Sequence, residues 1–123
     1  MTDVFPPPVL SLPEADVPIQ GATAYLAQGE GHQILFMRFS EDADLPAHTH
    51  AGQWGVVLAG KIELTIGDEK HVFKRGDRYY IPEGVKHSGR IYAGYTDITY
   101  FDQADRYAAK RQGNPVPARN DTD

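Results

Sequence analysis

The chain has 123 residues, the size of one ordinary domain, and carries a formal net charge of −5. Hydrophobic residues make up 41% and charged residues 24%, as is typical of folded globular proteins, so a wholly disordered chain is excluded. Because cysteine is absent, disulfides, zinc–thiolate sites and a thiol nucleophile are excluded as well.

No apolar run approaches the roughly 20 residues that span a bilayer. The N-terminus lacks the basic start and the helical apolar stretch of a signal peptide, so we expect a cytoplasmic protein. Acidic residues outnumber basic ones by seven to one in residues 1–44, whereas residues 45–123 hold ten acidic and eleven basic residues. No basic stripe runs along the chain, and we therefore expect neither a nucleic acid nor a membrane as a partner.

Residues 1–20 predict an extended N-terminal arm. Their five prolines exclude a helix and disfavour a central strand. The apolar side chains of the arm, Phe5 and Leu12 among them, are too many for a free tail. We expect the arm to lie along the body of the protein or to pair with a second copy in a homodimer.

Residues 21–102 predict one all-β domain. Short alternating or apolar runs are separated by turns, in a chain with 12 glycines and 9 prolines. The runs recur at intervals of roughly 8–12 residues, which is typical of a β-sandwich or barrel. The expected strands are Ala22–Gln28, His32–Phe39, Trp54–Ala59, Lys61–Ile66, His71–Lys74, Arg78–Ile81, Ser88–Tyr92 and Thr96–Phe101.

Residues 103–123 predict a short C-terminal helix and a loose tail. Gln103–Gln112 contains good helix formers and basic residues near its end, and glycine and proline follow it. The remaining residues carry no periodic pattern, so we expect no packed structure there.

Three of the five histidines form a candidate metal site. His48 and His50 stand two residues apart, and in an extended chain such side chains point to the same side. His87 follows much later, after a Pro-Glu-Gly turn, and meets the pair only if the sheet closes on itself, as in barrels and jelly rolls. His32 and His71 stand among polar neighbours and receive no role.

Two segments of the sequence resemble the motifs of the cupin superfamily. His48–Gly60 is similar to the first motif, in which an HxH pair precedes an acidic ligand seven residues before a glycine. Gly76–His87 matches the second motif, Gly-x5-Pro-x-Gly-x2-His, without a gap. The chain thus resembles a small single-domain cupin over about Gly21–Phe101. This implies a double-stranded β-helix, or jelly-roll, barrel.

The resemblance implies one divalent transition metal held by His48, His50 and His87. Gln53 stands at the position of the usual glutamate and is the expected fourth ligand, although the spacer before it is shorter than usual. Ile91 replaces an asparagine that often follows the second motif. Zn, Fe, Ni, Mn, Co and Cu all stay open. Since an amide leaves the ion its full double charge, we expect strong attraction for anionic ligands.

Strand alternation predicts part of the cavity lining. If Gln53 points inward, Gly55 points inward too, and Trp54 lies on the outer face as packing or as a dimer contact. Gly55 either leaves open space for a substrate beside the metal or relieves crowding between strands. Both interpretations stay open.

Arg38, Tyr92 and Tyr100 are the candidate catalytic residues. Arg38 lies in a run with two apolar faces and needs a partner, either a substrate carboxylate or an acidic residue at the barrel mouth. Tyr92, Tyr95 and Tyr100 follow His87, and they line the cavity mouth, supply a general acid, or simply pack.

Two classes of function are compatible with this sequence. The first is a metalloenzyme acting on a small oxygenated or carboxylated metabolite, of isomerase, lyase or dioxygenase type. Small cupins that ketonise unsaturated uronates are similar in having three histidines and a glutamine, which makes sugar acids one candidate substrate class. The second is a non-catalytic barrel that binds a sugar or another metabolite. A barrel whose histidines bind no metal also stays open.

Overall fold

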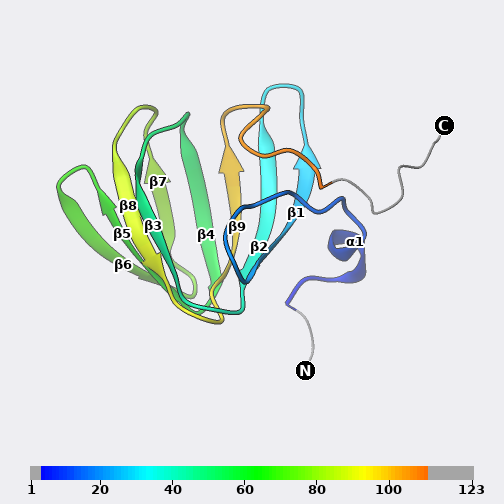
Figure 1. Cartoon of the computed structure of the whole chain (residues 1–123), viewed down its shortest axis with the longest axis horizontal. Coiled ribbons are helices and arrows are strands. Elements are labelled where there is room, and N and C mark those ends of the chain that lie inside the picture. The colour runs from blue at the N-terminus through cyan, green and yellow to red at the C-terminus, as the bar shows by residue number, and fades with distance from the viewer. Residues whose placement is uncertain (1–3, 111–123) are drawn as a thin grey trace.

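The computed structural model describes residues 4–110, in which nine strands and one short helix are found (Figure 1). The strands form two antiparallel sheets, which confirms the all-β class. In chain order they are β1 (Ala22–Gln28), β2 (Gln33–Phe39), β3 (Ala43–His48), β4 (Gln53–Ala59), β5 (Lys61–Ile66), β6 (Glu69–Lys74), β7 (Arg78–Ile81), β8 (His87–Ile91) and β9 (Thr96–Phe101).

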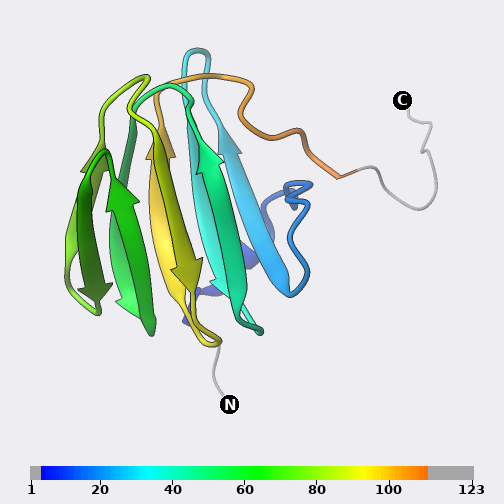
Figure 2. The ribbon, with the colours of Figure 1, turned by 60° about the vertical axis from the view of Figure 1, so that its left-hand side comes forward.

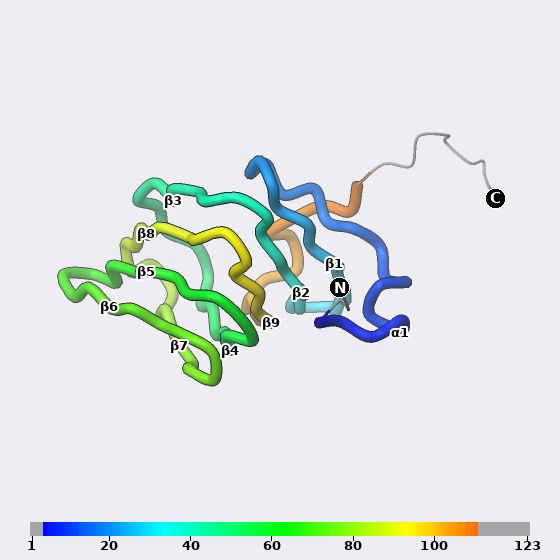
Figure 3. Tube along the Cα trace, turned by 90° about the horizontal axis from the view of Figure 1, so that it is seen from below, coloured from blue at the N-terminus to red at the C-terminus, as the bar shows by residue number. Residues whose placement is uncertain are grey.

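The two sheets lie face to face, as the views of Figures 2 and 3 show. One sheet has the order β1-β2-β9-β4-β7 and the other has the order β3-β8-β5-β6. Several strands that are neighbours in the chain, such as β2 and β3 or β4 and β5, belong to different sheets. These crossings bring β8 beside β3, so residues that are far apart in the sequence meet at one end of the molecule.

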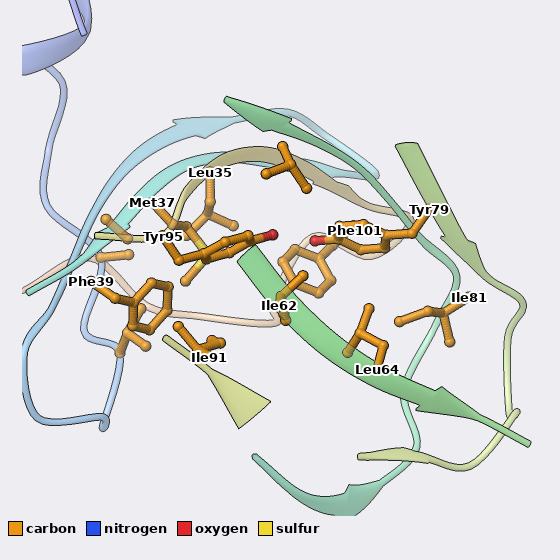
Figure 4. Packing of buried hydrophobic residues seen from close by; sticks show 14 of the residues in the cluster. Leu35, Met37, Phe39, Ile62, Leu64, Tyr79, Ile81, Ile91, Tyr95 and Phe101 are labelled. Carbon is orange, nitrogen blue, oxygen red and sulfur yellow. The ribbon is translucent and has the colours of Figure 1, made fainter. Parts of the chain in front are cut away.

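Alternating side chains fill the space between the sheets (Figure 4). In β2, Leu35, Met37 and Phe39 are buried while the residues between them are only half-buried, as expected for a strand with one inner face. β5 shows the same alternation with Ile62 and Leu64. The inner side chains of both sheets form one hydrophobic cluster, which supplies the main driving force for folding.

The eight predicted strands are present, with ends that agree to within two residues, but β3 was not predicted. Pro46 lies within this strand and argues against a strand on sequence grounds. The structure accommodates the proline because β3 is an edge strand, paired only with β8, and its register shifts between Leu45 and His48. An edge strand tolerates a residue that donates no hydrogen bond to the ladder.

The exclusion of a helix from residues 1–20 was wrong, because α1 spans Pro7–Leu10. Its prolines occupy the first helical turn, where the missing N–H groups have no intrahelical partner and the fixed φ suits a helix. Phe5, just before the helix, is buried and packs edge-on against Phe36, with the ring centroids 5.7 Å apart.

No described helix has the length and hydropathy of a membrane span. Pairing of this arm across a homodimer stays a prediction.

The helix predicted at Gln103–Gln112 is absent from its described part, residues 103–110. Ala109 instead forms an antiparallel bridge with Ala15, and the amide of Asp16 donates to the carbonyl of Ala108 at 2.7 Å. These hydrogen bonds to the N-terminal arm replace those that a helix would form within itself. The rest of the predicted helix and the predicted tail lie outside the described residues.

Candidate metal centre

The structure brings His48, His50 and His87 together at one end of the space between the sheets. His48 is the last residue of β3 and pairs in register with His87, the first residue of β8. His50 lies two residues beyond β3, in the turn toward β4. The ring centroids are 4.2 to 5.2 Å apart, and one nitrogen from each ring lies within 4.8 Å of the others. The structure thus brings together the three histidines that the sequence singled out.

A backbone carbonyl fixes the tautomer of each ring. The Nδ1 to oxygen distances are 2.7 Å from His48 to Pro46, 2.6 Å from His50 to Ala51 and 2.9 Å from His87 to Val85. A carbonyl only accepts hydrogen bonds, so Nδ1 carries the hydrogen and Nε2 keeps its lone pair. This is the arrangement of metal-binding histidines, whose second nitrogen is held by a hydrogen bond.

The spacing of the free nitrogens fits a common ion. Nε2 of His50 and Nε2 of His87 lie 3.1 Å apart, although neither has a hydrogen to share once Nδ1 is protonated. Two nitrogens that each lie about 2.0–2.1 Å from one metal ion are separated by roughly 2.9–3.4 Å at octahedral to tetrahedral angles. The three-histidine cluster can therefore hold a transition-metal ion.

The turn of the second motif joins two of these histidines. Gly84 has a φ of +76°, a left-handed conformation that strains any residue with a Cβ. In this conformation its amide donates to the carbonyl of His50 at 3.0 Å. Three residues later the chain enters β8 with His87, whose ring hydrogen bond goes to Val85 in the same turn. The motif thus fixes His50 and His87 relative to each other.

Gln53, the predicted fourth ligand, begins β4 and lies beside the triad in the same cavity. Its Nε2 donates to the hydroxyl of Thr99 at 3.0 Å. That hydroxyl in turn donates to the carbonyl of Trp54 at 3.2 Å, so its oxygen has to accept from Gln53. The amide nitrogen is therefore held by Thr99, and the amide oxygen Oε1, which is a suitable metal ligand, stays available.

A cavity of about 350 Å³ extends inward from the triad between the two sheets. Apolar side chains form most of its wall, among them Met37, Ile62, Leu64 and Ile91. Tyr79 fills the notch that Gly55 leaves, since a Cβ built on Gly55 would lie 2.3 Å from the Cζ atom of that ring. Gly55 thus relieves crowding between side chains and does not open space beside the metal site.

Comparison with protein families decides the identity of this fold. Residues 35–93 match the family model described as the cupin domain, and both sequence motifs lie within this range. The chain contains a cupin domain. The expected resemblance is thereby confirmed, and the His48, His50 and His87 triad resembles cupin metal sites.

Several solved structures share the arrangement of strands. An RmlC-like cupin from Shewanella frigidimarina has a TM-score of 0.67 at 20% identity, covering 76% of this chain and 86% of that one. KdgF from a Halomonas species has a TM-score of 0.63 at 19% identity, with coverages of 74% and 87%. A variant of Bacillus subtilis oxalate decarboxylase has a TM-score of 0.64 at 22% identity. This match covers 78% of this chain but 28% of that one. No curated protein matches the sequence.

The three predicted catalytic candidates lie outside the cavity of this cupin domain, whereas Tyr95 lies in its wall. Their contacts are a hydrogen bond of 3.1 Å from Arg38 to Tyr25, one of 2.9 Å from Tyr92 to Glu63, and stacking of Tyr100 on His32 at 5.3 Å. Trp54 is 42% exposed on the outer face, as the alternation predicted. Sequence periodicity could not show on which face of β2 Arg38 lies, because both faces of this strand carry apolar side chains.

Arg106, which sequence reasoning missed, lies in the cavity wall beside the triad. Its guanidinium lies 4.5 Å from the ring centroid of Tyr107 and faces Phe101 at 5.7 Å. Its Nε is buried and has no hydrogen-bond partner among residues 4–110. Arg106 is also the only lysine or arginine among the described residues that line the cavity.

A buried amide holds Arg106 in this position. Gln33, at the start of β2, is fully buried. Its side chain donates to the carbonyl of Tyr107 at 2.7 Å and accepts from the amide of Tyr107 at 3.0 Å. This two-point contact fixes the backbone next to Arg106 to the edge of the cavity. Gln33 and Tyr107 are 74 positions apart, so a local sequence pattern cannot reveal their contact.

Burial changes the protonation of two triad members. It lowers the pKa of His50 to about 4, with further lowering by the charges of His87 and Arg106. Burial also lowers the pKa of His87, helped by the charges of His48 and Arg106. A lowered histidine pKa means that the neutral, metal-binding form persists to lower pH.

Metal affinity should therefore resist mild acid. Between pH 7 and pH 5.5 we expect the apparent affinity for Zn²⁺ to fall by clearly less than it would for three histidines with ordinary pKa values, because protons compete weakly at His50 and His87. Three histidines with ordinary pKa values would lose several hundredfold over the same range, by roughly tenfold each. Competition titrations with a chelator of known pH dependence measure this slope. A loss of several hundredfold would contradict the described environment of the two rings.

Proposed function

We propose that this cupin domain binds a divalent transition metal through His48, His50, Gln53 and His87 and takes up a small carboxylated metabolite beside it. The observation that carries the proposal is the juxtaposition of the triad and Arg106 in one cavity. Three imidazoles and an amide oxygen leave the ion its full double charge. Together with the guanidinium they make this end of the cavity strongly positive, which favours an anion.

Each residue has a separate part in this proposal. A bound divalent ion would supply Lewis acidity, polarising a carbonyl or carboxylate oxygen. Arg106 binds the negative charge of the ligand and orients it, since it lines the cavity and the fork of N–H groups of a guanidinium matches a carboxylate. The apolar wall around Met37 and Ile62 excludes water from the rest of the ligand.

The proposed activity is that of a metalloenzyme of isomerase, lyase or dioxygenase type. Sugar acids remain one candidate substrate class. The alternative is a non-catalytic barrel that binds the same class of metabolite. It is favoured because the candidate catalytic residues Arg38, Tyr92 and Tyr100 do not line the cavity. Following a bound carboxylate by proton NMR over time separates the two, because an enzyme converts the ligand and a binding barrel returns it unchanged.

Carboxylate binding should depend on Arg106. In the Co²⁺-loaded protein, acetate, lactate and glucuronate should perturb the visible absorption of the metal. Arg106→Gln should weaken their binding by about tenfold or more, as expected when a charge-assisted hydrogen bond is lost. Arg90→Gln is the matched control, since Arg90 pairs with Asp44 at the surface. Equal affinities in the wild type and the Arg106 variant would refute the role of this arginine.

Thr99 should support metal retention through Gln53. Thr99→Val, which keeps the volume but removes the acceptor for the Gln53 amide, should weaken Zn²⁺ binding by about tenfold, whereas Thr99→Ser should retain it. Chelator competition gives the affinities, and melting curves of the metal-free variants show whether the fold is intact. If Thr99→Val binds metal as tightly as the wild type, Gln53 does not act as an oriented ligand.

A further inference from the structure

A buried carboxyl group lies in the wall of the same cavity, away from the triad. Asp97, on β9, is only 2% exposed and lines the cavity. Its Oδ2 accepts hydrogen bonds from the hydroxyls of Tyr79 at 2.8 Å and Tyr95 at 2.5 Å. Figure 4 shows these two hydroxyl groups turned toward each other in the interior. Its second oxygen, Oδ1, is buried and has no hydrogen-bond partner among residues 4–110.

Asp97 and the triad mark two separate ends of the cavity. Phe101 lies on the same face of β9 as Asp97, and its ring packs edge-on against His50 at 5.4 Å. Four residues along a strand correspond to roughly 13 Å, so Asp97 lies well inside the cavity relative to the metal site. The wall between the two ends is apolar and includes Ile62, Leu64 and Ile91.

Such a carboxyl group is costly to bury. A carboxylate in an apolar interior needs hydrogen-bond donors for both oxygens, and here only Oδ2 has them. Burial raises the pKa of Asp97 to about 6, while the hydrogen bonds from Tyr95 and Tyr79 lower it, so the group is mainly ionised in neutral solution. Asp97 lines the cavity, and Oδ1 is its one oxygen that lacks a donor.

We propose that Asp97 forms a second binding subsite, whose free oxygen accepts a hydrogen bond from a hydroxyl or ammonium group at the far end of the bound molecule. This inference rests on the proposed function, in which the carboxylate of that molecule lies beside the triad and Arg106. The ligand class is therefore a carboxylate with an apolar middle and a hydrogen-bond donor at its other end.

The tyrosines make the subsite selective. Both hydroxyl hydrogens are already donated to Oδ2, so the subsite presents oxygen lone pairs and no free donor. A second carboxylate on the ligand would meet only acceptors and a like charge. The subsite thus favours hydroxy- and amino-carboxylates and rejects dicarboxylates.

A matched series of probes tests the subsite at pH 8. Octanoate, 8-hydroxyoctanoate, 8-aminooctanoate and the dicarboxylate suberate are titrated calorimetrically into the Zn²⁺-loaded protein, together with their six- and ten-carbon homologues to cover ligand length. For the chain length that fits, we expect the hydroxyl and ammonium probes to bind about tenfold more tightly than the methyl-ended probe. The dicarboxylate should bind more weakly than the methyl-ended probe.

Asp97→Asn is the informative variant. The asparagine oxygen still accepts from both tyrosines, while an amide NH₂ replaces the free oxygen, so the fold is retained and the polarity of the subsite is reversed. The ammonium probe should lose its advantage and the dicarboxylate should gain affinity. Asp68→Asn, in an exposed turn, is the control that changes the same charge elsewhere.

The outcomes separate this inference from the proposed function. If methyl-, hydroxyl- and ammonium-ended probes of every length bind the wild type equally, the Asp97 subsite is refuted and carboxylate binding at the metal end stands. If no probe binds the metal-loaded protein, both proposals fall. The wild-type series alone gives this answer. The inference can therefore be refuted even if the Asp97→Asn variant does not fold.

Discussion

Protein purified without a nickel column should carry about one transition-metal ion per chain, and a variant with His48→Ala, His50→Ala and His87→Ala should carry none. One ligand nitrogen from each of the three rings lies within 4.8 Å of the others, and no other group of three histidine or acidic side chains in residues 4–110 does so. Elemental analysis by plasma mass spectrometry measures the metal content and identifies the ion.

The matched control for this experiment replaces the two remaining histidines. His32 stacks on Tyr100 and His71 pairs with Glu69 at 3.4 Å, both away from the triad. A variant with His32→Ala and His71→Ala should retain the metal of the wild type. Negligible metal in the wild type and the triple variant alike, even after reconstitution, would leave a metal-free binding barrel as the function.

Gly55→Ala should destabilise the fold by about 3 kcal/mol, the upper range for overpacking a core. The new methyl group would lie 2.3 Å from Cζ of Tyr79. That ring is 5% exposed, and its hydroxyl is held by Asp97, so it cannot swing away. Urea denaturation monitored by circular dichroism gives the free energy of unfolding for both proteins.

Two further variants test the cause of this loss. Tyr79→Leu removes the ring that the methyl group would strike, so the double variant Gly55→Ala/Tyr79→Leu should be little less stable than Tyr79→Leu alone. Gly31→Ala, where an added Cβ meets nothing within 4 Å, should change stability by less than about 0.5 kcal/mol. A Gly55→Ala protein as stable as the wild type would show that the Tyr79 ring does not occupy this notch.

The metal end of the site was predictable because its residues lie in short, regular patterns. His48 and His50 follow the two-residue period of an extended chain, and His87 follows a turn whose glycine needs a left-handed conformation. Such requirements act between near neighbours in the chain, so the sequence carries them directly. The same holds for strands such as Lys61–Ile66, whose alternation matches β5 at both ends.

The remainder of the site depends on contacts between distant residues. Arg106 reaches the cavity because Gln33 binds the backbone of Tyr107, and its own segment has the composition of a helix. Asp97 was not singled out from the sequence, because its significance comes from a contact with Tyr79 on β7, a second contact with nearby Tyr95, and one unpartnered oxygen. Local secondary-structure propensity reveals neither the position of Arg106 nor the environment of Asp97, because tertiary contacts override it.

The hydrogen bonds that hold residues 103–110 to the rest of the chain bear on the order in which the triad and Arg106 assemble. The triad is carried by residues 48–87, through the pairing of β3 with β8 and the hydrogen bond from Gly84 to His50. Arg106 needs the closure of almost the whole chain, through the Ala15–Ala109 bridge and the Gln33 contact. Because long loops close late, we expect a partly folded chain to bring the three histidines together before it places Arg106. The proposed metal site and the proposed ligand site would thus be completed at separate steps of folding.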